Sequence, residues 1–255
     1  MTHFTLTSKK WIFKLIAIIL WLLVWQLTAA WINKPLLVPA PLEVLERISQ
    51  LVVTNEFWKT VLLSFSRMIV GFLIGTFLGV VFAVLSYVSK ICHEILYVPL
   101  SVIKATPVAS FIILALIWLK SSFLSSFITM LMVTPIVWTN VFEGLNSVDK
   151  KLLEMAKVFE FSFFKKIKLI FVGCVKPYFL ASVMTACGLG WKAGIAAEVI
   201  AKPKNAIGTF LNDSKVYLET TDLFAWTVVV VVVSVILERL IKYAVKKIGK
   251  GGVKK

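Results

Sequence analysis

The sequence predicts an all-α fold, a polytopic transmembrane helical bundle of about six spans. Three observations lead to this prediction. Hydrophobic residues fill 59% of the 255 positions, charged residues fill only 16%, and long apolar runs alternate with short polar segments. Soluble globular chains carry roughly a quarter charged residues, so this composition is typical of a membrane protein.

The first predicted span covers residues 11–31 and follows Lys9 and Lys10. A basic start before an apolar run also occurs in signal peptides, and residues 28–30 form a weak cleavage-like site. The run exceeds the signal core of up to about 15 residues, so an uncleaved span is expected. Three prolines then break the chain, and an amphipathic helix lying in the membrane interface is expected over residues 42–51.

Five further apolar runs are predicted to be spans, each of which needs roughly 20 residues to cross a bilayer as a helix. The second of these, which is the third span, is short, so residues 96–103 are expected to supply its first turns, with kinks at Pro99 and Pro107. In the last run, residues 228–233 favour a strand in water. In lipid an isolated strand leaves its backbone unsatisfied, so a helix is expected there. The five runs are 58–88, 108–119, 123–141, 177–200 and 223–241.

Basic residues predict the orientation of the spans. They cluster between the fourth and fifth spans and in the tail, whereas the opposite segments balance Lys and Arg with Asp and Glu. Cytoplasmic loops carry the excess of Lys and Arg, so both termini and segment 143–176 are expected in the cytoplasm. Orientation and anionic lipid head groups then account for the net charge of +15, and no nucleic-acid partner is expected. The tail residues in this count are Arg239, Lys242, Lys246, Lys247, Lys250, Lys254 and Lys255.

Small residues recur at every fourth position on two spans, which allows close helix packing in lipid. The helix-packing positions are Gly71, Gly75 and Gly79 on the second span, and Gly190 and Gly194 on the fifth. An alternative is that these two helices line or gate a pathway.

Three charged residues are candidates for the translocation pathway or the bundle interior. Glu198 continues the small-residue face of the fifth span, and an ionisable residue within a span is a functional candidate. Lys192 on the same span and Arg67 on the second are the other two. Lys104, near the start of the third span, is a further intramembrane charge that could snorkel or pair with a carboxylate.

The motifs of soluble enzymes are missing from the sequence. There is no G-x-x-x-x-G-K-[ST] phosphate loop, no G-x-S-x-G elbow and no H-E-x-x-H zinc motif. The three cysteines are scattered and the two histidines lie far apart, so no metal site, cofactor site or catalytic residue is proposed for this chain. The chain is therefore not expected to be an enzyme.

Segment 143–176 is predicted to contain two short helices. Ser147 or Asp149 provides an N-cap for the first helix, and the second covers residues 163–172. Exposed aromatic residues between two spans indicate a docking element for another protein. An interfacial helix lying on anionic lipid is the alternative, which the lysines would also favour.

Several motifs in this segment and around it occur together in one order. The stretch Glu154-Met155-Ala156-Lys157-Val158-Phe159-Glu160 aligns with an E-A-A-x-x-x-G element, with Met155 at the first alanine and Glu160 at the glycine. Val172-Gly173 stands where a leucine-proline pair follows in that pattern. The other matches are Ser64-x-x-Arg67-x-x-x-Gly71-Phe72, Pro107, Pro135, Asn146-Ser147-Val148-Asp149, Pro177, Trp191, Ala197-Glu198 and Glu238-Arg239. Together these motifs resemble the permease subunits of binding-protein-dependent ABC importers of the nitrate/sulfonate/taurine type.

The resemblance implies a type I ABC importer permease, a single transmembrane domain over residues 1–255 in the cytoplasmic membrane of a prokaryote. It implies a homodimer with two cytoplasmic ATPase subunits that bind ATP and Mg²⁺, and an extracytoplasmic solute-binding protein. The cargo would be a nitrate-, sulfonate- or taurine-like anion or a vitamin precursor, moved by alternating access. The residues implied in ATPase coupling are Leu153, Glu154, Met155, Ala156, Phe159, Glu160 and Phe161.

Two questions stay open at this point. A glycine at the helix break supplies a left-handed backbone that a glutamate adopts only at a cost of roughly 1 kcal/mol, so either the break or the docking is expected to differ here. The leading functional alternative is a stand-alone ion-coupled secondary transporter or channel. That class would need internal repeats or ion ligands buried in the membrane.

Overall fold

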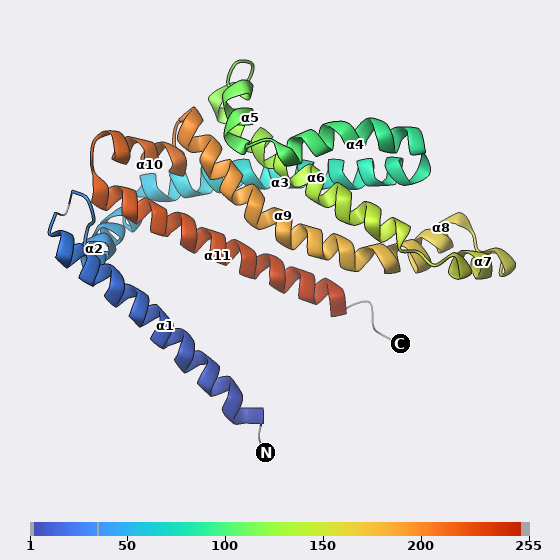
Figure 1. Ribbon diagram of the computed structural model, residues 1–255, viewed down its shortest axis with the longest axis horizontal. Helices are drawn as coiled ribbons and strands as arrows, with labels where there is room; N and C mark the ends of the chain where they lie inside the picture. Colours follow the sequence, from blue (N-terminus) through green and yellow to red (C-terminus); the bar gives the residue numbers. More distant parts are fainter. Residues whose placement is uncertain (1–2, 35, 251–255) are drawn as a thin grey trace. The chain divides into compact units, whose positions relative to one another are not determined.

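The computed structural model describes the backbone of residues 3–34 and 36–250, and the side chains of residues 12, 13, 15–34 and 36–247. The side chains of Lys9, Lys10 and Trp11 and the tail lysines from Lys250 onward therefore lie outside the described residues. Within those limits every regular element is a helix, which confirms the all-α prediction (Figure 1). The elements are α1 (His3–Ile32), α2 (Pro41–Val52), α3 (Asn55–Val88), α4 (Lys90–Ala105), α5 (Val108–Ala115), α6 (Ser121–Asn146), α7 (Lys150–Val158), α8 (Phe163–Lys166), the π-helix η1 (Ile167–Phe171), α9 (Val172–Ala201), α10 (Ile207–Val216) and α11 (Thr220–Lys250).

Five stretches of the described chain are long and apolar enough to cross a membrane as single helices, and a bent helix pair would make a sixth. The prediction of about six spans is thereby confirmed. The five stretches lie in α1, α3, α6, the continuous run α8–η1–α9, and α11. The valine run 228–233 is helical within α11, as lipid requires of a spanning segment.

The third predicted span differs from the expected single kinked helix. It consists of α4 and α5, which meet at an angle of 105°. The break falls at Thr106, whose backbone is extended with ψ 136°, because a residue before proline is driven out of the helical region. Pro99, by contrast, lies inside α4. The helix after the break ends at Ala115, short of the predicted Leu119.

The fifth predicted span also begins earlier than expected. The helix runs without interruption from Phe163 through the π-helix into α9, so Pro177 lies inside it. The second short helix predicted over residues 163–172 is therefore the first part of this long helix. A proline removes one helix hydrogen bond, and the helix continues past that position.

The contacts divide the chain into two compact units. Unit 1 comprises the described parts of residues 1–59 and 210–230. In this unit Arg47 forms a bidentate ion pair with Asp222. Its Nε donates to Oδ1 at 2.5 Å and its Nη2 donates to Oδ2 at 2.8 Å. The hydrogen bond that Arg47 donates to Asp222 raises the pKa of Arg47 above its ordinary value, so the guanidinium stays charged at physiological pH. Trp226 is buried between the rings of Phe57 and Phe210.

Unit 2 comprises the described parts of residues 60–209 and 231–255 and contains the packed helices α6 and α9. Glycines allow α3 and α9 to approach α6 closely. A Cβ added at Gly75 would lie 2.8 Å from the carbonyl oxygen of Met130, and one at Gly194 would lie 2.7 Å from Oγ1 of Thr129. Gly71, Gly79 and Gly190 face α6 in the same way, opposite Ser126, Val137 and Val133. The two small-residue stripes thus meet the same partner helix.

Candidate functional site

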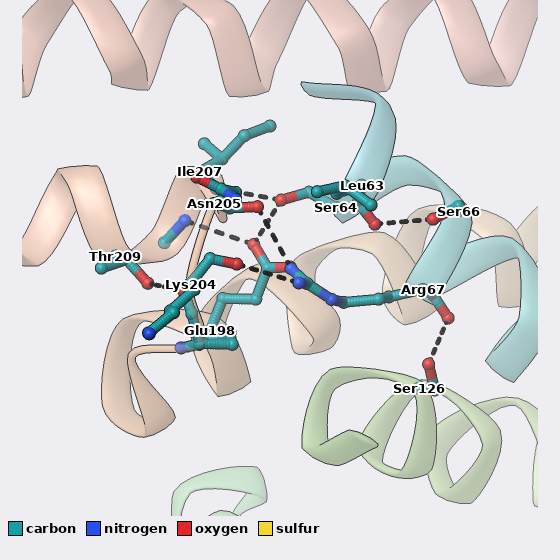
Figure 2. Close-up of polar contacts among 12 residues, drawn as sticks. Leu63, Ser64, Ser66, Arg67, Ser126, Glu198, Lys204, Asn205, Ile207 and Thr209 are labelled. Atoms are coloured by element: carbon teal, nitrogen blue, oxygen red, sulfur yellow. Dashed lines mark hydrogen bonds and ion pairs between the residues drawn. The ribbon is translucent and has the colours of Figure 1, made fainter. Parts of the chain in front are cut away.

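Glu198 is completely buried near the C-terminal end of α9, the end that lies away from α7 and α8 in Figure 1. Figure 2 shows the polar contacts around it. Its carboxylate accepts hydrogen bonds from three groups. Ser64 Oγ donates to Oε2 at 2.8 Å, the backbone N–H of Gly208 donates to the same oxygen at 3.3 Å, and Arg67 Nη1 donates to Oε1 at 3.4 Å. A buried charge is tolerated only when it is paired and hydrogen-bonded, and these partners meet that requirement.

The start of α10 is held by the same carboxylate. The first N–H groups of a helix have no partner within the helix and favour a negative charge. Ser64 Oγ accepts from the N–H of Ile207 at 2.9 Å while Glu198 accepts from that of Gly208. Gly208 packs so tightly on Glu198 and Val199 that an added Cβ would overlap both. Ser64, Glu198 and Gly208 therefore fix the first residues of α10, Ile207 and Gly208, against α3 and α9.

Arg67 fixes the loop between α9 and α10. Its guanidinium donates to the carbonyl oxygen of Lys204 at 3.0 Å and to that of Asn205 at 3.3 Å, in addition to Glu198. The loop bends sharply, since Lys202 and Asn205 both have φ 49°. On the other side, Ser126 of α6 donates to the carbonyl oxygen of Arg67 at 2.7 Å. Arg67 thus links α6, α9 and the loop to α3.

We call Ser64, Arg67, Glu198 and Gly208 the carboxylate clamp. Of these, the sequence analysis named Glu198 and Arg67 as candidates and quoted Ser64 only as part of a motif. The three-residue spacing of Ser64 and Arg67 was an available signal, because residues three apart share a helix face. Gly208 carried no such signal. Because the carboxylate oxygens are hydrogen-bonded and shielded from solvent, the clamp organises helices and offers no open ligand site.

Lys192 is not part of the carboxylate clamp. It is exposed on α9, has no hydrogen-bond or ion-pair partner among the described residues, and lines a cavity together with Lys104 of α4. Among the residues searched, no group of His, Cys, Asp and Glu side chains could hold a metal ion. The charged candidates of the sequence thus fall into one closed cluster and one open cavity.

The segment between α6 and α9 is a folded element with its own small core. Asp149 caps α7 by accepting from the N–H of Lys151 at 2.9 Å. Ala156 is fully buried with Val148 and Ile170, and Leu153 and Phe161 pack around them. Of the seven predicted coupling residues, Leu153, Ala156 and Phe161 therefore hold the segment together.

The end of α7 contradicts one of the two expectations for Glu160, that the helix break has another geometry. Phe161 N–H donates to Ala156 O at 2.9 Å and Glu160 N–H donates to Lys157 O at 3.1 Å, the two bonds of a Schellman motif. Glu160 has φ 50°, so it adopts the left-handed conformation that usually selects glycine. The break thus keeps the glycine geometry with a glutamate in it.

The other coupling residues point outward with several apolar neighbours. Glu154, Met155, Phe159 and Glu160 are exposed. Phe159 is 69% exposed and Phe164 is 81% exposed. Exposed apolar residues of this segment include Met155, Val158, Phe159, Phe163 and Phe164, and we call these five the apolar tip. Exposed apolar groups gathered in this way mark a contact with another protein or a membrane.

The sequence matches the model of one protein family and is similar to several named proteins. The family described as "Binding-protein-dependent transport system inner membrane component" matches residues 71–250. Nitrate import permease protein NrtB of Synechocystis is 26% identical over 250 residues, covering 92% of this chain and 88% of its own. SsuC of Bacillus subtilis, a permease named for aliphatic sulfonates, is 24% identical over 213 residues, covering 83% of this chain and 77% of its own.

The alignments with one further relative and with one solved structure also cover nearly the whole of this chain. Bicarbonate transport system permease protein CmpB of Synechococcus elongatus is 23% identical over 256 residues, with 92% of this chain and 91% of its own covered. A chain in the crystal structure of a bacterial ABC transporter involved in the import of the acidic polysaccharide alginate aligns with a TM-score of 0.62. That alignment covers 96% of this chain and 99% of the other, at 14% identity, and shows a shared fold.

Proposed function

The chain belongs to the binding-protein-dependent transport system inner membrane components, and from this premise we propose that it is the permease of an ATP-driven importer for a small anion. ATP and Mg²⁺ would be bound by a separate cytoplasmic ATPase. A solute-binding protein would deliver the cargo from outside, and two copies of this chain would form the pathway with two ATPase subunits below it.

The apolar tip is the observation that carries this proposal. It lies on the folded segment between α6 and α9, next to exposed Glu154 and Glu160. The core around Ala156 packs α7 against Val148 and Ile170, so a partner could transmit force through it to α6 and α9. A rigid apolar surface rimmed with charge fits a groove on a soluble protein better than it fits lipid alone.

The orientation follows from charge. Lysines concentrate on the α7–α8 segment and in the tail, which favours a cytoplasmic position for both. The apolar tip would then face the cytoplasm, where an ATPase operates, and the carboxylate clamp would lie towards the outer side, where a binding protein delivers its solute.

An anionic cargo is supported by the relatives. Their names refer to nitrate, bicarbonate and aliphatic sulfonates, all of which are small anions. The carboxylate of Glu198 is already paired with Arg67, so it adds no free negative charge that would repel such a cargo.

Alternating access would couple the two ends. ATP binding would close the ATPase pair and move the apolar tips of the two copies, so that the α6–α9 pairs tilt and exchange an outward opening for an inward one. A ligand or nucleotide can drive such a change only if it binds the two states with different affinity. The clamp would keep the residues that it joins, on α3, on α9 and at the first turn of α10, moving together.

The test is co-purification and transport. The affinity-tagged chain is expressed with candidate ATPase subunits, isolated in mild detergent and reconstituted in liposomes with the binding protein. The proposal predicts a stable complex and solute uptake that requires ATP. Solute flux through the chain alone, without an ATPase, would contradict it and favour a stand-alone transporter.

A further inference from the structure

A cavity of about 400 Å³ lies in unit 2 at the break between α4 and α5, with α6 and α9 forming its other walls. Pockets for small molecules typically have volumes of about 300–1,000 Å³. Two cationic side chains line this cavity, Lys104 from α4 and Lys192 from α9. None of the residues that line it carries a carboxylate.

No ion pair among the described residues neutralises either lysine. Lys104 Nζ donates to Oγ1 of Thr139 at 2.9 Å and lies 5.5 Å from the ring centroid of Trp138, so neutral groups orient its ammonium. Lys192 has no ion-pair or hydrogen-bond partner among the described residues. The carboxylate of the same helix, Glu198, is used in the carboxylate clamp. Ionisable residues in spans are costly and mark substrate pathways when they face a cavity.

The backbone at the break adds to this positive field. Thr106 and Val108 line the cavity, so the start of α5 lies at its wall. No side chain caps that start, since the N-cap residue is Pro107 and the hydroxyl of Thr106 donates to the carbonyl oxygen of Val102. The N–H of Ser110 donates to the carbonyl oxygen of Pro107 at 3.0 Å, and the N-terminal end of a helix favours a negative charge.

The rest of the cavity wall is apolar. Ile103, Met132 and Leu189 are among the side chains that form it. A bare inorganic anion would lose hydration against such a wall without a replacement, whereas an organic anion would bury its apolar portion there. The wall therefore favours an anion with an apolar portion.

From this arrangement we propose that the cavity binds an organic anion, a sulfonate or carboxylate with a short apolar portion, whose head group contacts Lys104 and Lys192. The proposal rests on the proposed function and narrows its cargo from small anions in general to this class. An anionic lipid head group has the same chemistry, and we assign the site to the soluble anion because a helix break within a span serves transport better than lipid anchoring.

The test is a binding titration on the full-length chain in nanodiscs of phosphatidylcholine, with butane-1-sulfonate as the probe. Methionine at Lys104 or Lys192 retains the length of the side chain and removes its charge. Each of Lys104→Met and Lys192→Met is expected to weaken binding by about tenfold or more, since a charged hydrogen bond is lost. Lys192→Arg is expected to retain binding. Lys90→Gln, at the other end of α4 and outside the cavity, is the matched control and is expected to bind as the wild type does.

Folding is not expected to obscure the result, because removing a charge from a span favours insertion. Two further probes test which part of the ligand the cavity recognises: a neutral alcohol without the anionic group and an inorganic anion without the apolar portion. Butan-1-ol and nitrate are each expected to bind more weakly than butane-1-sulfonate. Equal binding by wild type and the Lys104→Met/Lys192→Met double variant would overturn the site, and tighter binding of nitrate would overturn the organic class.

The lipid source and the importer itself are tested separately. Phosphatidylglycerol in the nanodiscs is expected to leave the sulfonate affinity nearly unchanged, and full displacement of the sulfonate by that lipid would reassign the site to lipid. If no ATPase co-purifies but sulfonate binding still depends on both lysines, the importer proposal fails and the anion site stands. If the ATPase co-purifies and the lysines are irrelevant, the importer stands and the site fails.

Discussion

The hydroxyl of Ser64 on α3 donates a hydrogen bond of 2.8 Å to the carboxylate of Glu198 on α9, although 134 positions separate the two residues. The same hydroxyl accepts from the backbone of Ile207, so one oxygen joins α3, α9 and α10. The relationship explains how a carboxylate can be fully buried in an apolar bundle, and it provides the first of five predictions.

Replacing Ser64 with alanine is expected to destabilise the protein. The change leaves Glu198 with fewer donors and the N–H of Ile207 without its acceptor, and a buried polar group left unpaired costs about 1–3 kcal/mol. Thermal unfolding in detergent would measure the loss. Ser66→Ala is the control. Ser66 is exposed on the same helix, and its hydroxyl donates to the carbonyl oxygen of Leu63 (Figure 2). Equal effects of the two changes would contradict the assigned role of Ser64.

Arg67 and Glu198 are expected to be energetically coupled. Arg67→Met leaves the buried carboxylate with one positive partner fewer, and breaking a buried pair costs about 3–5 kcal/mol. Adding Glu198→Gln removes the stranded charge and is expected to recover part of that loss. A double-mutant cycle on unfolding free energies should give a coupling of about 0.5–3 kcal/mol. Strict additivity would mean that the 3.4 Å contact has no energetic weight.

Gly75→Ala is expected to push α3 and α6 apart. The added Cβ would lie 2.8 Å from the Met130 carbonyl oxygen and 2.9 Å from Cβ of Val133, and overpacking of this kind costs about 1–3 kcal/mol. Gly173→Ala is the control, since nothing lies within 4 Å of an added Cβ there. Alanine in that helical position is expected to stabilise by about 0.5–1 kcal/mol. A thermal shift of the same sign in both variants would disprove the packing argument.

Glu160→Gly is expected to stabilise the α7–α8 segment and to preserve ATPase association. Glycine adopts φ 50° freely, whereas a residue with a Cβ loses about 1 kcal/mol or more there. Hydrogen exchange of the segment should slow, and co-purification with the ATPase should be unchanged. Lys157→Gly, within the last turn of α7, is the control and should speed exchange. Loss of the ATPase complex in Glu160→Gly would instead show that this carboxylate makes a specific contact.

Glu154→Arg is expected to uncouple ATP hydrolysis from uptake. Glu154 is exposed beside the apolar tip, so reversing its charge should place a repulsive or unpaired cation at the docking surface. The measurement is the number of ATP molecules hydrolysed per solute imported, which should rise. Glu143→Arg, exposed on the last turns of α6, is the control and should leave the ratio unchanged. Normal hydrolysis and uptake in Glu154→Arg would exclude a coupling role.

The helices and their count could be predicted because the bilayer imposes them. A span must satisfy its backbone internally and reach across the hydrocarbon, so apolar runs such as Leu15–Ile32 are sufficient evidence for helices. The shape of the third span could not be predicted in this way. Hydropathy measures only the apolar content of α4 and α5, and the 105° bend between them depends on backbone geometry at Thr106 and Pro107.

The candidate site likewise could be predicted only in part from the sequence. The sequence alone determined that Glu198 lies within a span on the face that carries Gly190 and Gly194, because helical periodicity is local. Only the tertiary structure decided that Arg67, Ser64 and Gly208 close around that carboxylate, while Lys104 and Lys192 line a cavity with no carboxylate in its wall. The physical reason is that helix faces follow from a repeat of 3.6 residues, whereas the pairing of charges depends on which helices come together.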